Sequence, residues 1–81
     1  MLAFMLVETE AGLREKGLVN VGEEFSKIPE VEHVYILTGI FDLLVQVRAR
    51  DMDHLSELVL RKLRQVQGVS KVNTMLSMWG N

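Results

Sequence analysis

The hydrophobic and polar positions along the chain predict six elements of secondary structure. Residues Leu2 to Val7 are apolar at every position, and such a run is typical of a strand buried on both faces. The next apolar residues are spaced as one stripe of an amphipathic helix, which Pro29 ends. Gly22 lies near this stripe, where the lack of a side chain lets the helix sit close to a sheet. The stripe comprises Leu18, Val21, Phe25 and Ile28.

Two strands joined by a turn follow this helix. The segment Val31 to Thr38 is rich in β-branched residues, which favours a strand. Gly39 and Ile40 fit a tight turn, and Phe41 to Arg50 predicts the next strand. Its side chains alternate between two faces: Phe41, Leu43, Val45 and Val47 on one, and Asp42, Leu44, Gln46 and Arg48 on the other.

A second helix and a last strand complete the chain. Asp51 is a suitable N-cap residue, because its side chain can accept a hydrogen bond from a free backbone N–H. Gly68 suits the end of the helix, and Val69 to Trp79 predicts a strand. The helix has a wide apolar face, with Leu58 and Leu60 at its edges. Its central stripe is Met52, Leu55, Val59, Leu63 and Val66.

The resulting order is βαββαβ. Right-handed crossovers arrange this order as an α+β, ferredoxin-like fold, with an antiparallel four-stranded sheet and both helices on one face. We expect a single domain over residues 1–81. The helices cover only one face, yet the first strand is apolar on both. A second copy is the simplest cover, so we expect a face-to-face homodimer, a dimeric α+β sandwich or barrel.

Composition narrows the classes of function. The chain has no cysteine, which excludes disulfides, and its two histidines do not suggest a structural zinc site. A net charge of −2 gives no sign of a nucleic-acid surface. The apolar start is too short for a membrane span or a signal peptide, so we expect a cytoplasmic protein. No motif implies a metal or another cofactor.

Four sequence motifs carry a family resemblance that extends over essentially the whole chain. They are P-E-V before a strand, T-G-I-F-D-L-L-V-Q-V, D-M-D-H-L, and Q-G-V-S-K-V-N-T. With these motifs the chain resembles the effector-binding (RAM) domain of the Lrp/AsnC family of amino-acid-responsive transcriptional regulators. The resemblance implies the same βαββαβ fold, sheet-to-sheet dimers, and further assembly as a tetramer of dimers in an octameric ring.

The resemblance also implies a function. In the family a small molecule, usually an amino acid, binds between dimers near the turn that joins the second and third strands. The chain has no helix-turn-helix before its first strand, so we expect a stand-alone effector module that does not bind DNA or membranes directly. It is expected to act in transcriptional regulation by co-assembling with full-length Lrp/AsnC regulators.

The candidate effector site is centred on Asp42, an acidic residue inside an apolar run. Its carboxylate could cap the turn by accepting backbone N–H bonds, receive the ammonium of an amino acid, or do both. Gly39 gives a ligand carboxylate access to the backbone. The resemblance adds residues from the second helix and the last strand. The full set is Thr38, Gly39, Ile40, Phe41, Asp42, Met52, Met75, Leu76 and Ser77.

An enzyme is the alternative function. Small dimeric ferredoxin-like proteins include cofactor-free monooxygenases and isomerases, which enclose a substrate between sheet and helices. Here apolar side chains are expected to fill that space, which favours a binding module. His33 is read as a strand-surface residue and His54 as a residue of the first helical turn, each without a carboxylate at metal spacing.

Overall fold

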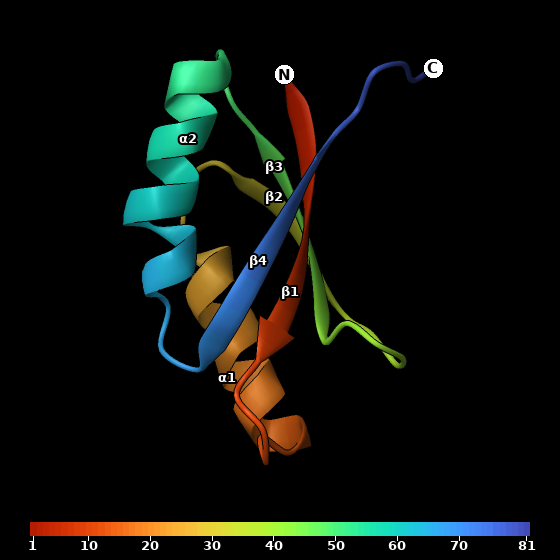
Figure 1. The fold of residues 1–81 in the computed structure, drawn as a ribbon, viewed down its shortest axis with the longest axis vertical. Coiled ribbons are helices and arrows are strands. Elements are labelled where there is room, and N and C mark those ends of the chain that lie inside the picture. The colour runs from red at the N-terminus through yellow and green to blue at the C-terminus, as the bar shows by residue number, and fades with distance from the viewer.

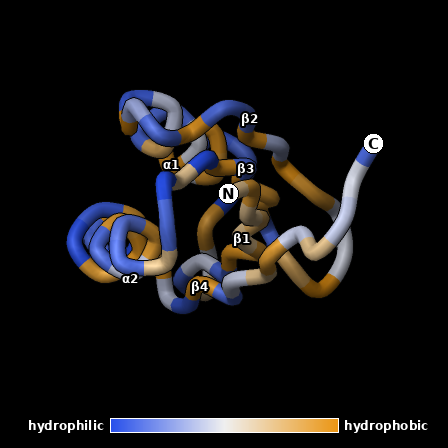
Figure 2. The backbone as a smooth tube through the Cα atoms, turned by 90° about the horizontal axis from the view of Figure 1, so that it is seen from above, coloured by the Kyte–Doolittle hydropathy of each residue, from blue (hydrophilic) through white to orange (hydrophobic).

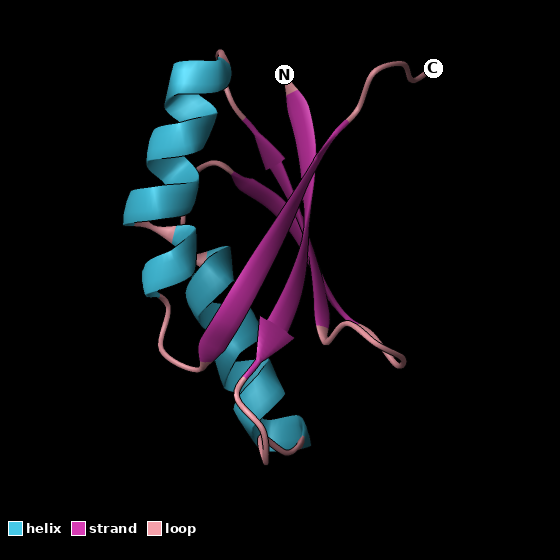
Figure 3. Ribbon diagram, in the orientation of Figure 1, coloured by secondary structure: helices cyan, strands magenta, loops and turns pink.

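The computed structural model describes residues 1–81 and has the predicted βαββαβ order. Figure 3 shows two helices against one sheet. The strands lie side by side in the order β2-β3-β1-β4, and all three strand pairs are antiparallel. The elements are β1 (Leu2–Thr9), α1 (Glu15–Ser26), β2 (Val31–Ile36), β3 (Leu43–Arg48), α2 (Met52–Arg61), a short 3-10 helix η1 (Leu63–Gln65) and β4 (Val69–Leu76). The predicted ferredoxin-like fold is thus confirmed.

Both helices lie on the same face of the sheet, as Figures 1 and 2 show from two directions. The core fills the space between these two layers. In β1, every second side chain from Ala3 to Val7 has no solvent exposure. The twelve core residues are Ala3, Met5, Val7, Val21, Phe25, Leu43, Val45, Val47, Ala49, Leu55, Leu58 and Leu63.

The other face of the sheet, here called the outer face, has no cover within the chain. Strand pairing places Met75 beside Phe4, and Leu44 beside Leu6. At the rim, Arg48 and Gln46 both donate hydrogen bonds to the Glu32 carboxylate, and the Arg48 Nε–Glu32 Oε2 distance is 3.0 Å. The outer face therefore has a half-buried apolar centre and a rim that carries charges of both signs.

The helices are shorter than predicted. Helix α1 ends at Ser26, so Pro29 lies beyond it. Helix α2 ends at Arg61, because the backbone tightens into η1 before Gly68, whose φ of +95° reverses the chain. The predicted N-cap is confirmed: Asp51 Oδ1 accepts a 2.8 Å hydrogen bond from the His54 N–H.

The buried face of α2 also differs from the predicted stripe. Leu58, placed at an edge by the sequence pattern, is only 2% exposed, whereas Met52 is 49% exposed. Met52 is the first residue of the helix and lies at the margin of the layer. The helix is only ten residues long, so Leu55 and Leu58, three positions apart, are enough to define its inner side.

Candidate functional site

The loop between β2 and β3 is wider than the predicted tight turn. The Leu37 N–H donates to the Asp42 carbonyl oxygen at 2.8 Å, so the closed segment includes residues 38–41. Gly39 has a φ of +124°, which side chains rarely permit, and nothing lies within 4 Å of where its Cβ would be. Ile40 is 87% exposed at this loop. The loop thus offers an accessible backbone in open space.

The Asp42 carboxylate ties this loop to the end of β1. Its Oδ2 atom accepts a hydrogen bond from the Thr9 N–H and another from the Thr9 hydroxyl, each 2.8 Å long. The Asp42 N–H in turn donates to the Val7 carbonyl oxygen at 2.9 Å. The capping role is therefore present in the structure. Oδ1 accepts no hydrogen bond from the protein and is not buried, so it remains available to a ligand.

The other predicted site residues lie at the opposite end of the sheet. Leu76 pairs with Ala3 at the start of β1, whereas Leu43, next to the loop, pairs with Val7 near its end. Met52 follows β3 at the same end as Leu76. Figure 1 shows this separation, with the β2–β3 loop at the lower right and the end of β4 at the top. One subunit therefore does not bring Asp42 together with Met52, Met75, Leu76 or Ser77.

The structure also contains a polar cluster that the sequence did not predict. His54 Nε2 lies 2.9 Å from Glu30 Oε2, and Lys62 Nζ lies 3.3 Å from Glu30 Oε1. The His54 Nδ1 atom accepts a hydrogen bond from the Arg50 N–H at 2.9 Å. The ring proton therefore lies on Nε2, which donates a hydrogen bond to Glu30. This hydrogen bond, followed by contributions that include Lys62, holds the pKa of the Glu30 carboxyl below its ordinary value of 4.5. His54 lies in the first turn of α2 as predicted, but the sequence did not predict its pairing with Glu30, which is 24 positions away.

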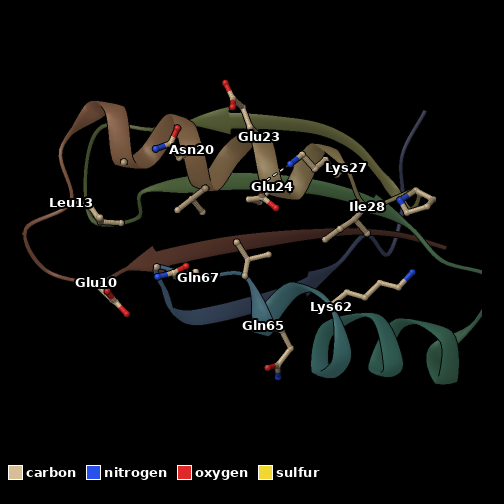
Figure 4. Close-up of a pocket in the computed structure, with 15 residues that line it drawn as sticks. Glu10, Leu13, Asn20, Glu23, Glu24, Lys27, Ile28, Lys62, Gln65 and Gln67 are labelled. Atoms are coloured by element: carbon tan, nitrogen blue, oxygen red, sulfur yellow. Dashed lines mark hydrogen bonds and ion pairs between the residues drawn. The ribbon is translucent and has the colours of Figure 1, made fainter.

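A surface groove with a volume of about 1020 Å³ lies on the helix side. Figure 4 shows charged and amide side chains around it, including Glu10, Lys27 and Lys62. It runs from α1 to the segment after α2, away from the β2–β3 loop. A smaller cleft adjoins the Glu30–His54 pair. Neither depression lies between the sheet and the helices, where the alternative enzyme would hold its substrate.

None of the helices is both long and apolar enough to cross a membrane.

A family comparison gives a direct match. The model of the Lrp/AsnC ligand binding domain matches residues 2–79. An uncharacterised HTH-type transcriptional regulator from Pyrococcus furiosus is 38% identical over 77 residues. That alignment covers 93% of this chain and 49% of the relative, so the chain spans about half the length of the curated relatives it matches.

Solved structures show the same fold. The crystal structure of TTHA0845 from Thermus thermophilus is 29% identical with a TM-score of 0.83, and the match covers 99% of this chain and 95% of that one. The transcriptional regulator NMB0573 from Neisseria meningitidis, solved as an L-Met complex, is 27% identical with a TM-score of 0.80. That match covers 99% of this chain and 52% of the regulator.

Proposed function

Because the chain belongs to the Lrp/AsnC family through its ligand-binding domain, we propose that it is a regulatory module that binds a neutral amino acid. The matched family model describes a ligand-binding domain and the relatives are transcriptional regulators, which supports a regulatory module over the alternative enzyme. No contact or cavity described above favours the alternative enzyme.

The observation that carries the proposal is the pairing of two recognition groups at one loop. A free amino acid has an ammonium and a carboxylate at a fixed spacing. The free Oδ1 atom of Asp42 suits the ammonium, and the open backbone around Gly39 suits the carboxylate. Asp42 then has two roles: Oδ2 caps the loop through Thr9, and Oδ1 contacts the bound amino acid.

The side chain of the ligand requires a second subunit. Met52, Met75 and Leu76 are all 44% exposed or more, and they lie at the far end of the sheet from Asp42. In the proposed site they come from a neighbouring subunit, together with Ser77. Methionine side chains adapt to several ligands, and these mostly apolar contacts favour a neutral one. The L-Met complex of the Neisseria relative supports L-methionine as the first ligand to test.

The proposed assembly begins with a homodimer through the outer face. Its apolar centre is uncovered in the single chain, and the balanced charges of its rim allow one copy to face another. Further association into a tetramer of dimers would use apolar residues on the helix side, such as Leu60, which is 55% exposed. Full-length Lrp/AsnC regulators, which share this domain, are proposed as co-assembly partners.

The DNA-binding part of the proposed regulation resides in those partners. The 81 residues carry a net charge of −2, which does not favour phosphate contacts. The first turn of each helix contains an acidic residue, Glu15 in α1 and Asp53 in α2. In a gel-shift experiment at physiological salt, the purified chain alone should leave duplex DNA unshifted, and a clear shift would contradict this part of the proposal.

The decisive experiment is titration calorimetry with the standard amino acids, starting with L-methionine. Binding of a neutral amino acid supports the proposal. A parallel titration with the matching amino-acid amides, which keep the ammonium but lose the carboxylate, tests the backbone half of the site. If no amino acid binds to the assembled protein, the proposal fails.

A further inference from the structure

The turn from β3 into α2, residues 49–53 and here called the corner, is held by His54. The Arg50 N–H donates to His54 Nδ1 at 2.9 Å, and the His54 backbone N–H donates to Asp51 Oδ1 at 2.8 Å. One residue therefore bonds to two successive residues of the corner, once through its ring and once through its backbone. Figure 1 shows the corner at the upper end of α2.

Glu30 fixes the same ring from the other side. The His54 Nε2 atom donates to the Glu30 carboxylate at 2.9 Å, and the Glu30 carbonyl oxygen accepts the Arg48 N–H at 3.0 Å. The side chains of His54 and Glu30 are only 14% and 18% exposed. Because Glu30 binds the proton on Nε2, Nδ1 is left as the acceptor that the Arg50 N–H needs.

Met52 lies within this network. It is the first residue of α2 and is 49% exposed, and its neighbours Asp51 and His54 are both bonded as described. A methionine side chain has three rotatable bonds, so it contacts a ligand reproducibly only if the backbone that carries it is fixed. Loss of the Arg50 bond would free the backbone just before Met52.

We propose that His54 is a positioning residue of the effector site, whose Nδ1 atom holds the corner so that Met52 contacts the bound amino acid. This role rests on the proposed function and deepens it by naming a residue that acts on the ligand through another. It also requires a neutral ring. Imidazole groups gain a proton on acidification between about pH 8 and pH 5, and a protonated Nδ1 cannot accept the Arg50 N–H.

The charges around the ring determine what acidification changes. Lys62 contacts the second oxygen of Glu30 at 3.3 Å, and Arg61 pairs with Glu57 along α2. A protonated ring therefore keeps its bond to Glu30, now between opposite charges, and loses only the bond to Arg50. Acid thus loosens the corner without releasing His54. The charged groups around the ring are Glu30, Arg50, Asp51, Glu57, Arg61 and Lys62.

Two substitutions separate the two ring nitrogens. The side-chain oxygen of asparagine lies where Nδ1 of histidine lies, and glutamine places its amide near the position of Nε2. In calorimetry with L-methionine, His54→Gln should weaken binding about tenfold, because it loses the Arg50 bond. His54→Asn, which keeps that acceptor, should bring the affinity back to within about threefold of the natural chain.

The pH profile is the second measurement. The affinity of the natural chain for L-methionine should fall about threefold to tenfold between about pH 7.5 and pH 5.5, whereas that of His54→Asn should stay constant. The control is Glu57→Gln, which changes the same cleft without touching the ring and should follow the natural chain. Each His54 variant loses one of the two ring hydrogen bonds, so both should melt at similar temperatures, and their difference in affinity would not reflect stability.

NMR of methyl-labelled methionine tests the corner without any ligand. The Met52 methyl signal, assigned with Met52→Leu, should shift or broaden on acidification, and His54→Gln should change it already near neutral pH. In His54→Asn it should not respond to pH. Met5, which has no solvent exposure, supplies a methyl signal that should stay constant throughout.

The outcomes separate this role from the proposed function. A Met52 signal that ignores both pH and His54→Gln would overturn the role of His54. An altered Met52 signal with unaltered affinity would mean that His54 only stabilises the start of α2, which also overturns it. Equal losses of affinity in His54→Asn and His54→Gln would trace the effect to Glu30 and contradict the assignment to Nδ1. If no amino acid binds, but the Met52 signal depends on His54, the proposed function fails while the hold of His54 on the corner stands.

Discussion

Asp42 and Thr9 are joined by two hydrogen bonds to a single carboxylate oxygen, and this pair fixes the β2–β3 loop to the end of β1. Both bonds go to Oδ2, so the second oxygen is left for another partner. The apolar run around Asp42 accommodates a carboxylate because the acid lies at the entrance of β3, where the backbone and hydroxyl of Thr9 compensate its lost hydration.

The first prediction separates the cap from the ligand contact. Asp42→Asn removes the charge and should lower the free energy of unfolding by about 1–3 kcal/mol, and weaken amino-acid binding by about tenfold to a hundredfold. Thr9→Val removes only the hydroxyl bond, at a cost of about 0.5–1.5 kcal/mol, with a much smaller effect on affinity. Thermal melts and calorimetry measure the two effects. Equal affinities of the natural chain and Asp42→Asn would mean that Asp42 is a cap alone.

The second prediction concerns acid stability. The pKa of Glu30 is lowered in the folded state, so this carboxylate stabilises the fold above its ordinary pKa of 4.5. The contribution is lost as the pH falls through the folded value. Glu30→Gln should therefore lower the free energy of unfolding by about 1 kcal/mol at pH near 7, and this difference should shrink towards pH near 3.

The control for this prediction is Glu57→Gln. Glu57 pairs with Arg61 on the exposed surface of α2, where both side chains are more than 60% exposed. Such pairs contribute about 0–1 kcal/mol, so this variant should melt like the natural chain across the same pH range. A difference between Glu30→Gln and the natural chain that does not change with pH would contradict the assigned linkage.

The third prediction separates two levels of assembly. Phe4→Asp places a charge at the apolar centre of the outer face and should convert dimers to monomers, because burying an unpaired carboxylate is costly. Leu60→Glu changes the helix side and should stop assembly at the dimer. Sedimentation velocity distinguishes these species, and circular dichroism checks that both variants fold. Dimers that persist in Phe4→Asp would contradict the outer-face interface.

The fourth prediction compares two glycines. Gly39→Ala has room for a methyl group but must adopt a φ of +124°, so it should destabilise the fold by about 1–3 kcal/mol. At Gly22 an added Cβ would lie 3.6 Å from Leu43 and Val34, an ordinary contact within a helix. Gly22→Ala should therefore stabilise the fold by about 0.5–1 kcal/mol. Chemical denaturation measures both, and a destabilised Gly22→Ala would mean that α1 lies too close to the sheet for a methyl group.

The fold could be predicted from the sequence because the hydrophobic patterns that define its elements are local. The unbroken apolar run of β1 indicates a strand, alternation in β3 separates inner from outer residues, and helical spacing in α1 identifies Val21 and Phe25 as buried. The end of α2 could not be predicted from the sequence, because it depends on where the backbone tightens into η1. In the shorter helix, Leu55 and Leu58 define the buried side, whereas the predicted stripe extended to Val66, beyond the end of α2.

The candidate site could be predicted only in part. The position of Asp42 beside a loop follows from the pattern, but its Thr9 partner is 33 residues away, and pairing at that range has no local signal. The Glu30–His54 pair was missed for the same reason. Met52 and Met75 remain predicted site residues, because they approach the loop only if another subunit supplies them.

The sheet order has a consequence for synthesis on the ribosome. The central strand β1 is made first, but its partners are β3 and β4, with Leu2 paired to Arg48 and Ala3 paired to Leu76. A nascent chain therefore carries an apolar strand with two open edges until more than half of the sequence has emerged. Contacts at such separation form slowly. Aggregation during synthesis should thus begin at residues 2–7, and a trigger-factor-type chaperone that shields this segment would raise the yield of folded protein.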